Sequence, residues 1–132
     1  DRGFPVSMME EIIGLIRKYD AQKHVYLMTT NDQRIREVMA YAPDIPCCVG
    51  WDRNKDPMSM VDRAIALNAY KIQLFKPYFD QAMVDEAHEK GLICTVFWAA
   101  DPDEAERYLD MGIDTILTND YNLVSQVVPR KR

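Results

Sequence analysis

The sequence predicts an α/β fold in which parallel strands alternate with helices along the whole chain. The expected strands are short apolar runs rich in β-branched residues: 24–29, 45–50, 70–75, 92–98 and 114–118. Several are apolar on both parities, which is typical of strands buried on both faces of a parallel sheet. Helix-start signals near residues 7, 31, 56, 80, 101 and 120 recur every 19 to 25 residues. That spacing fits one strand–helix unit repeated five times.

Most of the predicted helices begin at a capping signal. Ser7, with Glu10 three residues later, has the pattern of a capping box before the first helix. Later helices follow short polar side chains that can accept from the first turn: Asn31, Asp56, Asp80 and Asp101. Two of these aspartates precede a proline, which suits the first helical position. Gly91 and Gly112 follow helical runs, where a residue with left-handed backbone ends a helix.

Composition and charge limit the class of protein. The 132 residues suit a single α/β domain, 1–132, with 48% hydrophobic and 28% charged residues as in ordinary globular proteins. Apolar and aromatic residues on this scale exclude intrinsic disorder. No apolar run approaches the roughly 18 residues of a transmembrane span. The net charge of −5 argues against a nucleic-acid partner.

Three cysteines, Cys47, Cys48 and Cys94, lie in apolar runs. Their odd number and their spacing provide neither a disulfide framework nor a CxxC metal site. We therefore expect three reduced, buried thiols. Residues 1–20 lack the basic stretch followed by an apolar stretch that characterises a signal peptide. We therefore expect a cytoplasmic protein.

Five units are too few for a closed (β/α)₈ barrel, which needs eight units and typically about 250 residues. The repeat fits either a five-stranded doubly wound sheet or part of a barrel. A partial barrel has the neighbour order 1-2-3-4-5, whereas a flavodoxin-like sheet has the order 2-1-3-4-5. The chain also opens on a helix rather than a strand, which leads us to expect a missing upstream segment.

Candidate ligand-binding residues lie where the strands end, because parallel α/β folds bind ligands at the carboxyl ends of their strands. These ends carry Thr29-Thr30-Asn31, Trp51-Asp52, Phe75-Lys76, Trp98 and Thr118-Asn119-Asp120. Such a rim suits a small polar ligand with an apolar part, although helix capping or interior packing explains several members equally well. Neither His24, at the start of a strand, nor His88, in mid-helix, is expected to be a catalytic base. A glycine-rich phosphate loop is absent from the sequence.

Several motifs occur in a fixed order along the chain. They are Ile72-Gln73-Leu74-Phe75, Ala87-His88 with Gly91, Phe97-Trp98, Glu104-Ala105, and Gly112-Ile113-Asp114 leading to Thr118-Asn119-Asp120. Together with the passage at residues 34–46, this ordered set resembles the C-terminal part of the glycerophosphodiester phosphodiesterase family. The resemblance covers about residues 8–128.

The resemblance implies a TIM barrel in which the predicted strands are the fourth to the eighth. It matches Trp98 to the family's active-site aromatic, whose ring should face the concave side of the sheet. It also makes Gln73 and Asn119 possible substrate-binding residues by strand position. The family's catalytic signature of histidines, carboxylates and a lysine belongs to the first three units. That signature is absent here, since Asp1-Arg2-Gly3 lacks the histidine of the His-Arg-Gly motif. No catalytic residue or metal ligand can therefore be assigned.

Two functions remain open at this point. In the first, the chain is the C-terminal part of a phosphodiesterase of lipid metabolism. The parent enzyme would use a divalent cation, Mg²⁺ or Ca²⁺, to release glycerol 3-phosphate and an alcohol from glycerophosphodiesters. The chain alone would then be inactive, would bind no cation, and would associate through its open strand edges with an upstream half or with itself. The alternative is a non-enzymatic five-unit α/β binding or interaction module, natural or engineered.

Overall fold

Five strand–helix units follow an N-terminal helix in the computed structural model, which describes residues 5–128. The elements are α1 (Val6–Lys18), β1 (Leu27–Thr29), α2 (Asp32–Tyr41), β2 (Cys47–Gly50), the 3₁₀ turn η1 (Pro57–Ser59), α3 (Met60–Ala66), β3 (Lys71–Phe75), α4 (Gln81–Glu89), β4 (Ile93–Phe97), α5 (Pro102–Asp110), β5 (Thr115–Leu117) and α6 (Tyr121–Val124). Each predicted strand is present inside its predicted range and is shorter than predicted.

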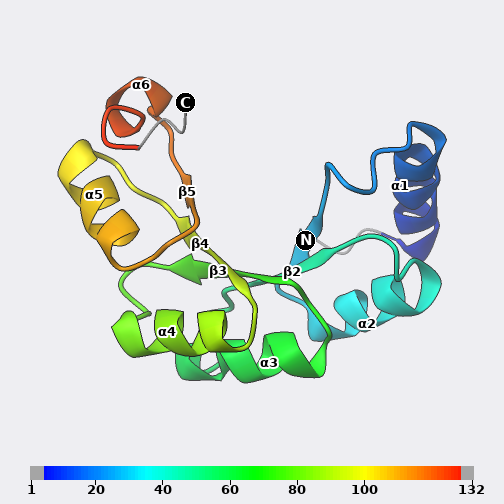
Figure 1. Cartoon of the computed structure of the whole chain (residues 1–132). Helices are drawn as coiled ribbons and strands as arrows, with labels where there is room; N and C mark the ends of the chain where they lie inside the picture. The colour runs from blue at the N-terminus through cyan, green and yellow to red at the C-terminus, as the bar shows by residue number, and fades with distance from the viewer. Residues whose placement is uncertain (1–4, 129–132) are drawn as a thin grey trace.

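The strands form one parallel sheet in the order β1-β2-β3-β4-β5. This confirms the predicted neighbour order and excludes the flavodoxin-like order. Figure 1 shows the helices along the outside of the sheet, in an arc that runs from α1 to α6. Among residues 5–128, β1 and β5 have no strand partner on their outer edges. The fold is therefore an open part of an α/β barrel of the TIM type.

Alternate residues of each strand face the helices and the inner, concave side of the sheet. The helix-facing positions hold apolar side chains that are 0–2% exposed: Cys47, Val49, Ile72, Leu74, Cys94 and Val96. The intervening positions of β3 and β4 face the concave side: Lys71, Gln73, Phe75, Ile93, Thr95 and Phe97. The main hydrophobic core thus lies between the sheet and its helices, while the concave side carries polar and aromatic groups.

The concave side and the sheet's first edge expose apolar surface. Met28, Phe97 and Leu117 are 47%, 40% and 40% exposed. An apolar groove of about 140 Å³ runs beside β1 and is lined by Met9, Ile12, Leu27, Met28, Thr29, Arg34 and Val38. Unpaired strand edges next to apolar surface favour association with another strand. Within residues 5–128, no helix has the length and apolar character needed to cross a membrane.

Most predicted helix ends are confirmed, and one is wrong. Four side-chain caps accept from backbone N–H groups as predicted: Asn31 from Arg34, Asp56 from Met58, Asp80 from Met83 and Asp101 from Glu104. Gly91 and Gly112 have φ values of 76° and 89°, as predicted for residues that end helices. The capping box is not formed, because α1 begins at Val6 and Ser7 lies inside its first turn. Pro5, with φ −61° and ψ 153°, precedes the helix, so the chain enters it before Ser7 can cap.

Asp32 links three consecutive parts of the fold. Its carboxylate accepts from Arg63 of α3 at 2.6 Å (Nη2–Oδ1) and 3.3 Å (Nε–Oδ2). The Lys55 ammonium, in the loop after β2, lies 2.9 Å from Oδ1 and also donates to the Thr30 carbonyl. The hydrogen bonds from Arg63, assisted by Lys55, lower the pKa of Asp32 from 3.8 to about 2.

The lowered pKa of Asp32 predicts a loss of stability in acid. A carboxyl group whose pKa is lower in the folded state stabilises the fold above its unfolded pKa, and that contribution is lost as pH falls from about 4 to about 2. We expect this contribution to be about 1 kcal/mol, allowing for solvent screening. Urea unfolding from pH 5 to pH 2 should show a shallower pH dependence for Asp32→Asn than for the original chain. Parallel profiles would rule out the proposed role of Asp32.

Candidate ligand site at the strand ends

Five aromatic side chains gather at the carboxyl ends of β2, β3 and β4. This aromatic cluster consists of Trp51, Phe75, Tyr78, Phe97 and Trp98. Phe75 is its central ring, with centroid distances of 4.6 Å to Trp51, 5.8 Å to Phe97 and 6.0 Å to Trp98. Tyr78 stacks on Trp51 at 5.1 Å. The parallel strands bring these rings together because each strand ends at the same edge of the sheet.

Trp98 follows β4 and lies at the rim of the aromatic cluster. Its ring contacts Phe97 at 5.0 Å and Phe75 at 6.0 Å, and the Lys76 ammonium lies 5.0 Å from its centroid. Trp98 is half-buried and does not belong to the helix-facing core. It therefore lies where a ligand at the strand ends could contact it. A substrate-binding role for Trp98 stays a prediction.

Phe97 is a candidate that the sequence reasoning missed. It is the last residue of β4, in register with Phe75 of β3 and Leu117 of β5. Strand alternation places it on the concave side, and its side chain is 40% exposed. Counting every second residue along the strand from Thr95 to Phe97 would have identified it.

Gln73 lies on the concave side, between Gly50 of β2 and Thr95 of β4 in the register. It lines a small pocket of about 60 Å³ whose walls are Met28, Thr30, Gly50, Trp51, Leu74, Phe75 and Phe97. A Cβ at Gly50 would lie 3.0 Å from the Met28 sulfur and 3.1 Å from the Thr30 methyl group, so a larger residue would crowd these neighbours. The Trp51 indole N–H is buried and has no hydrogen-bond partner among the described residues. The structure thus brings Gln73 and three members of the aromatic cluster, Trp51, Phe75 and Phe97, into one pocket.

Asn119 is exposed in the turn between β5 and α6. Its neighbours form that turn, since the Asp120 N–H donates to Thr118 Oγ1 at 3.0 Å and Asp120 caps α6. Within the described part of the chain, neither a hydrogen bond nor a ring contact joins Asn119 to Gln73 or to the aromatic cluster. Asn119 lies at the same end of the sheet but does not contribute to the pocket around Gln73.

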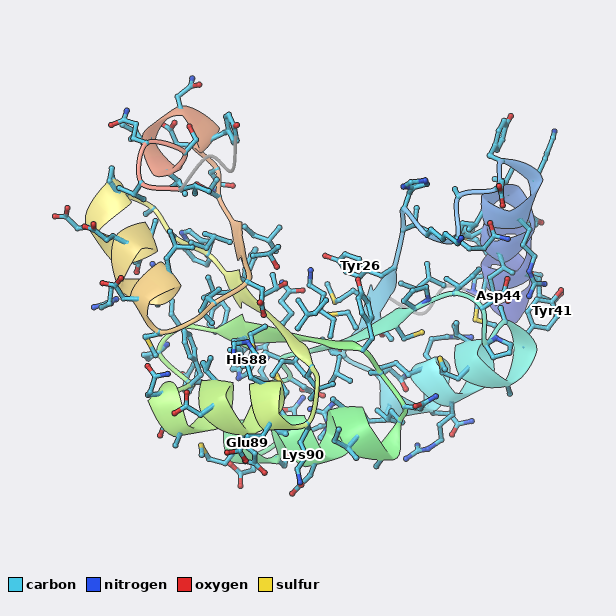
Figure 2. The ribbon with its side chains drawn as sticks, viewed as in Figure 1. Tyr26, Tyr41, Asp44, His88, Glu89 and Lys90 are labelled. Atoms are coloured by element: carbon cyan, nitrogen blue, oxygen red, sulfur yellow. The ribbon has the colours of Figure 1, made fainter. Side chains whose placement is uncertain are left out.

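Lys71 is a second residue that the sequence reasoning missed. It begins β3 on the concave side and is only 6% exposed. Its ammonium lies 4.5 Å from the centroid of the Tyr26 ring, which belongs to the segment just before β1. Figure 2 shows Tyr26 at the inner side of the open sheet. The alternation of Lys71, Gln73 and Phe75 with buried aliphatic residues was the signal for this position.

Lys76 is held at the rim by a partly buried acid. Its ammonium lies 2.7 Å and 2.8 Å from the two carboxylate oxygens of Glu104. Glu104 also accepts from the Ala100 N–H at 2.8 Å and from the Tyr108 hydroxyl at 3.3 Å. Burial raises the pKa of Glu104, but the hydrogen bonds from Lys76 and Ala100 outweigh it and lower the pKa overall. Glu104 thus fixes a cation beside the Trp98 ring.

The described strand ends do not fit a divalent-cation site by themselves. Mg²⁺ and Ca²⁺ need several convergent oxygen ligands. The nearby carboxylates already accept hydrogen bonds: Asp52 from Asn54, Asp101 from Glu104, Asp120 from Leu123, and Glu104 from Lys76. A group of three ligating side chains does occur among residues 5–128, but at the opposite end of the strands. His24 precedes β1 and is exposed, and Asp1, Arg2 and Gly3 lie outside the described residues.

An open parallel sheet with its strands in sequential order, and with aromatic side chains at their carboxyl ends, is typical of part of an α/β barrel. Residues 4–123 match the family model described as the glycerophosphoryl diester phosphodiesterase family. Because this match spans most of the chain, the protein belongs to that family. No curated protein matches the chain by sequence comparison.

Solved structures share the fold at low sequence identity. A candidate glycerophosphodiester phosphodiesterase from Galdieria sulphuraria has a TM-score of 0.80 and 22% identity, over 89% of this chain and 48% of its own. A candidate glycerophosphoryl diester phosphodiesterase from Silicibacter pomeroyi has a TM-score of 0.82 and 18% identity, over 91% and 42%. A phosphodiesterase from Oleispira antarctica, in complex with the product sn-glycerol-3-phosphate, has a TM-score of 0.61 and 16% identity, over 72% and 38%. The chain spans less than half the length of each of these proteins.

Proposed function

We propose that the chain is the C-terminal part of a metal-dependent glycerophosphodiester phosphodiesterase. The complete enzyme hydrolyses a glycerophosphodiester to glycerol 3-phosphate and an alcohol. The observation that carries this proposal is the pocket at the strand ends of an open sheet, in a chain that covers 42–48% of the two most similar structures described above. Parallel barrels bind their substrates at this end.

The described residues have a binding role in this proposal. The aromatic cluster gives the substrate an apolar wall, with Trp98 at the rim and Gln73 as a polar group inside the pocket. Asn119 approaches the substrate from the turn after β5. The acid–base histidines and the ligands of the Mg²⁺ or Ca²⁺ ion come from the upstream part. When bound, the ion neutralises charge on the phosphate.

The upstream part also completes the sheet. The free edge of β1 pairs with its last strand and the free edge of β5 with its first strand, and it covers Met28, Phe97 and Leu117 on the concave side. The apolar groove between α1 and β1 receives side chains of the preceding strand. The three unpaired, buried cysteines suit a reducing compartment such as the cytoplasm.

The experiment is a complementation assay. The 132-residue chain is assayed for hydrolysis of glycerophosphodiesters with Mg²⁺ or Ca²⁺, alone and after mixing with the segment encoded directly upstream. We expect glycerol 3-phosphate only from the mixture, and a requirement for the divalent ion. Metal-dependent turnover by the chain alone would contradict the division of roles. If no barrel segment is encoded upstream, or if the mixture is inactive although the parts associate, the non-enzymatic binding module becomes the better account.

A further inference from the structure

Three metal-ligating side chains converge at the amino-terminal ends of β4 and β5. This His–Cys–Asp cluster consists of His88 from the last turn of α4, Cys94 from β4, and Asp114 just before β5. Their ligand atoms all lie within 4.8 Å of one another. Figure 2 shows His88 rising from the end of α4 toward the sheet. The cluster therefore joins a helix and two strands that are separate in the sequence.

Each member of the cluster is held in place by the surrounding backbone. Asp114 Oδ2 accepts from the Cys94 N–H at 2.7 Å and lies 3.0 Å from His88 Nε2. The His88 ring rests against Gly112, where a Cβ would lie 3.3 Å from the ring carbon Cε1. Gly112 also has a φ of 89°, so both its backbone and its missing side chain favour this arrangement. The three donors are thus positioned before any ion arrives.

We propose that the His–Cys–Asp cluster binds one Zn²⁺ ion or a similar divalent transition-metal ion. Imidazole nitrogen, thiolate sulfur and carboxylate oxygen are the donor types that Zn²⁺ takes in proteins, and four-coordinate sites commonly combine three side chains with a water molecule. The His88 and Asp114 side chains are 38% and 42% exposed, which gives the ion a path from solvent and leaves room for that water. Cys94 is fully buried and closes the inner side of the site.

Binding changes bonds at two places in the cluster. Burial, with a smaller effect of the Asp114 charge, raises the pKa of the Cys94 thiol to about 12, so it carries its proton when no ion is bound. The ion replaces that proton: the S–H bond breaks, a sulfur–metal bond forms, and the proton passes to water. The His88–Asp114 hydrogen bond gives way to two bonds to the ion. The bound ion then ties β5, an edge strand of three residues, to α4 and β4.

Titration of the metal-free 132-residue chain with Co²⁺ tests the site directly. A Co²⁺–thiolate bond has a charge-transfer absorption in the near ultraviolet, so the spectrum reports on Cys94 itself. We expect one equivalent of Co²⁺ to produce this absorption and Zn²⁺ to displace it. We also expect Zn²⁺ to raise the thermal unfolding midpoint by about 10 °C when free ion exceeds the dissociation constant a hundredfold. A folded chain that shows no thiolate absorption would overturn the proposal.

Matched variants separate ion binding from a purely structural contact. Cys94→Ser should abolish the absorption, whereas Cys47→Ser changes another buried cysteine outside the cluster and should keep it. His88→Gln can still donate to Asp114 but supplies no imidazole, and it should weaken Co²⁺ binding about a hundredfold or more. If the absorption persists in Cys94→Ser, or if His88→Gln binds as tightly as the original chain, the cluster is not the metal site.

Discussion

Replacement of Phe75 by alanine is expected to lower the free energy of unfolding by about 3 kcal/mol. Phe75 is the central ring of the aromatic cluster and has ring contacts with its four other members. Its removal leaves a void between Trp51 and Trp98 and removes the favourable ring pairs along with the buried area. Urea unfolding followed by tryptophan fluorescence measures the loss, because both tryptophans lie next to the substituted position.

Two controls show whether the loss comes from the ring contacts. Phe75→Leu keeps much of the apolar volume and should cost about 1 kcal/mol. Tyr121→Ala removes an aromatic ring that is 74% exposed on α6 and should change the free energy by less than about 0.5 kcal/mol. If Phe75→Ala costs no more than Tyr121→Ala, the five rings do not stabilise the strand ends as a unit.

Replacement of Trp98 by alanine is expected to raise the KM of the complete enzyme about thirtyfold, equal to about 2 kcal/mol of substrate binding. The change in kcat should be small, because an apolar wall binds the ground state and the transition state alike. This prediction rests on the proposed function, and steady-state kinetics with a glycerophosphodiester measures it. Lys76 stays anchored by Glu104 in this variant, which limits the disturbance to the ring itself.

Phe97→Ala is the matched comparison for Trp98→Ala. The two residues are adjacent, but strand alternation places Phe97 on the concave side, whereas Trp98 lies at the rim beside Lys76. An unchanged KM for Trp98→Ala together with a raised KM for Phe97→Ala would show that Phe97, and not Trp98, contacts the substrate. Equal stability of the two variants, checked by urea unfolding, would show that the kinetic difference arises at the site.

Local signals in the sequence predicted the helix starts and the order of the strands well. A cap such as Asp101 needs only the N–H group of Glu104, three residues away, so the pattern and the structure agree. The regular spacing of the units likewise predicts neighbouring parallel strands, because each helix returns the chain to the adjacent strand. Strand lengths were overestimated, since pairing begins only where a neighbour is in register, as at Leu27 opposite Cys47.

Contacts between distant residues could not be predicted from such local signals. His88 and Asp114 are 26 residues apart, and nothing in the helix around His88 indicates its partner. The position of Lys71 over Tyr26 likewise depends on how β1 lies across the sheet. The capping box predicted at Ser7 was wrong for a local reason. Pro5, with its fixed φ, precedes α1, so the helix begins before Ser7.

The central claim is that this open sheet is one part of a closed barrel, and hydrogen exchange at the sheet edges tests it most directly. Backbone alternation turns the N–H groups of Met28 in β1 and of Ile116 in β5 away from their strand neighbours. We expect these two amides to exchange rapidly in the chain alone and about a hundredfold more slowly once the upstream part is bound. The central amides of β3, such as that of Leu74, should change little. Unchanged exchange at both edges in the saturated mixture would contradict barrel closure through β1 and β5.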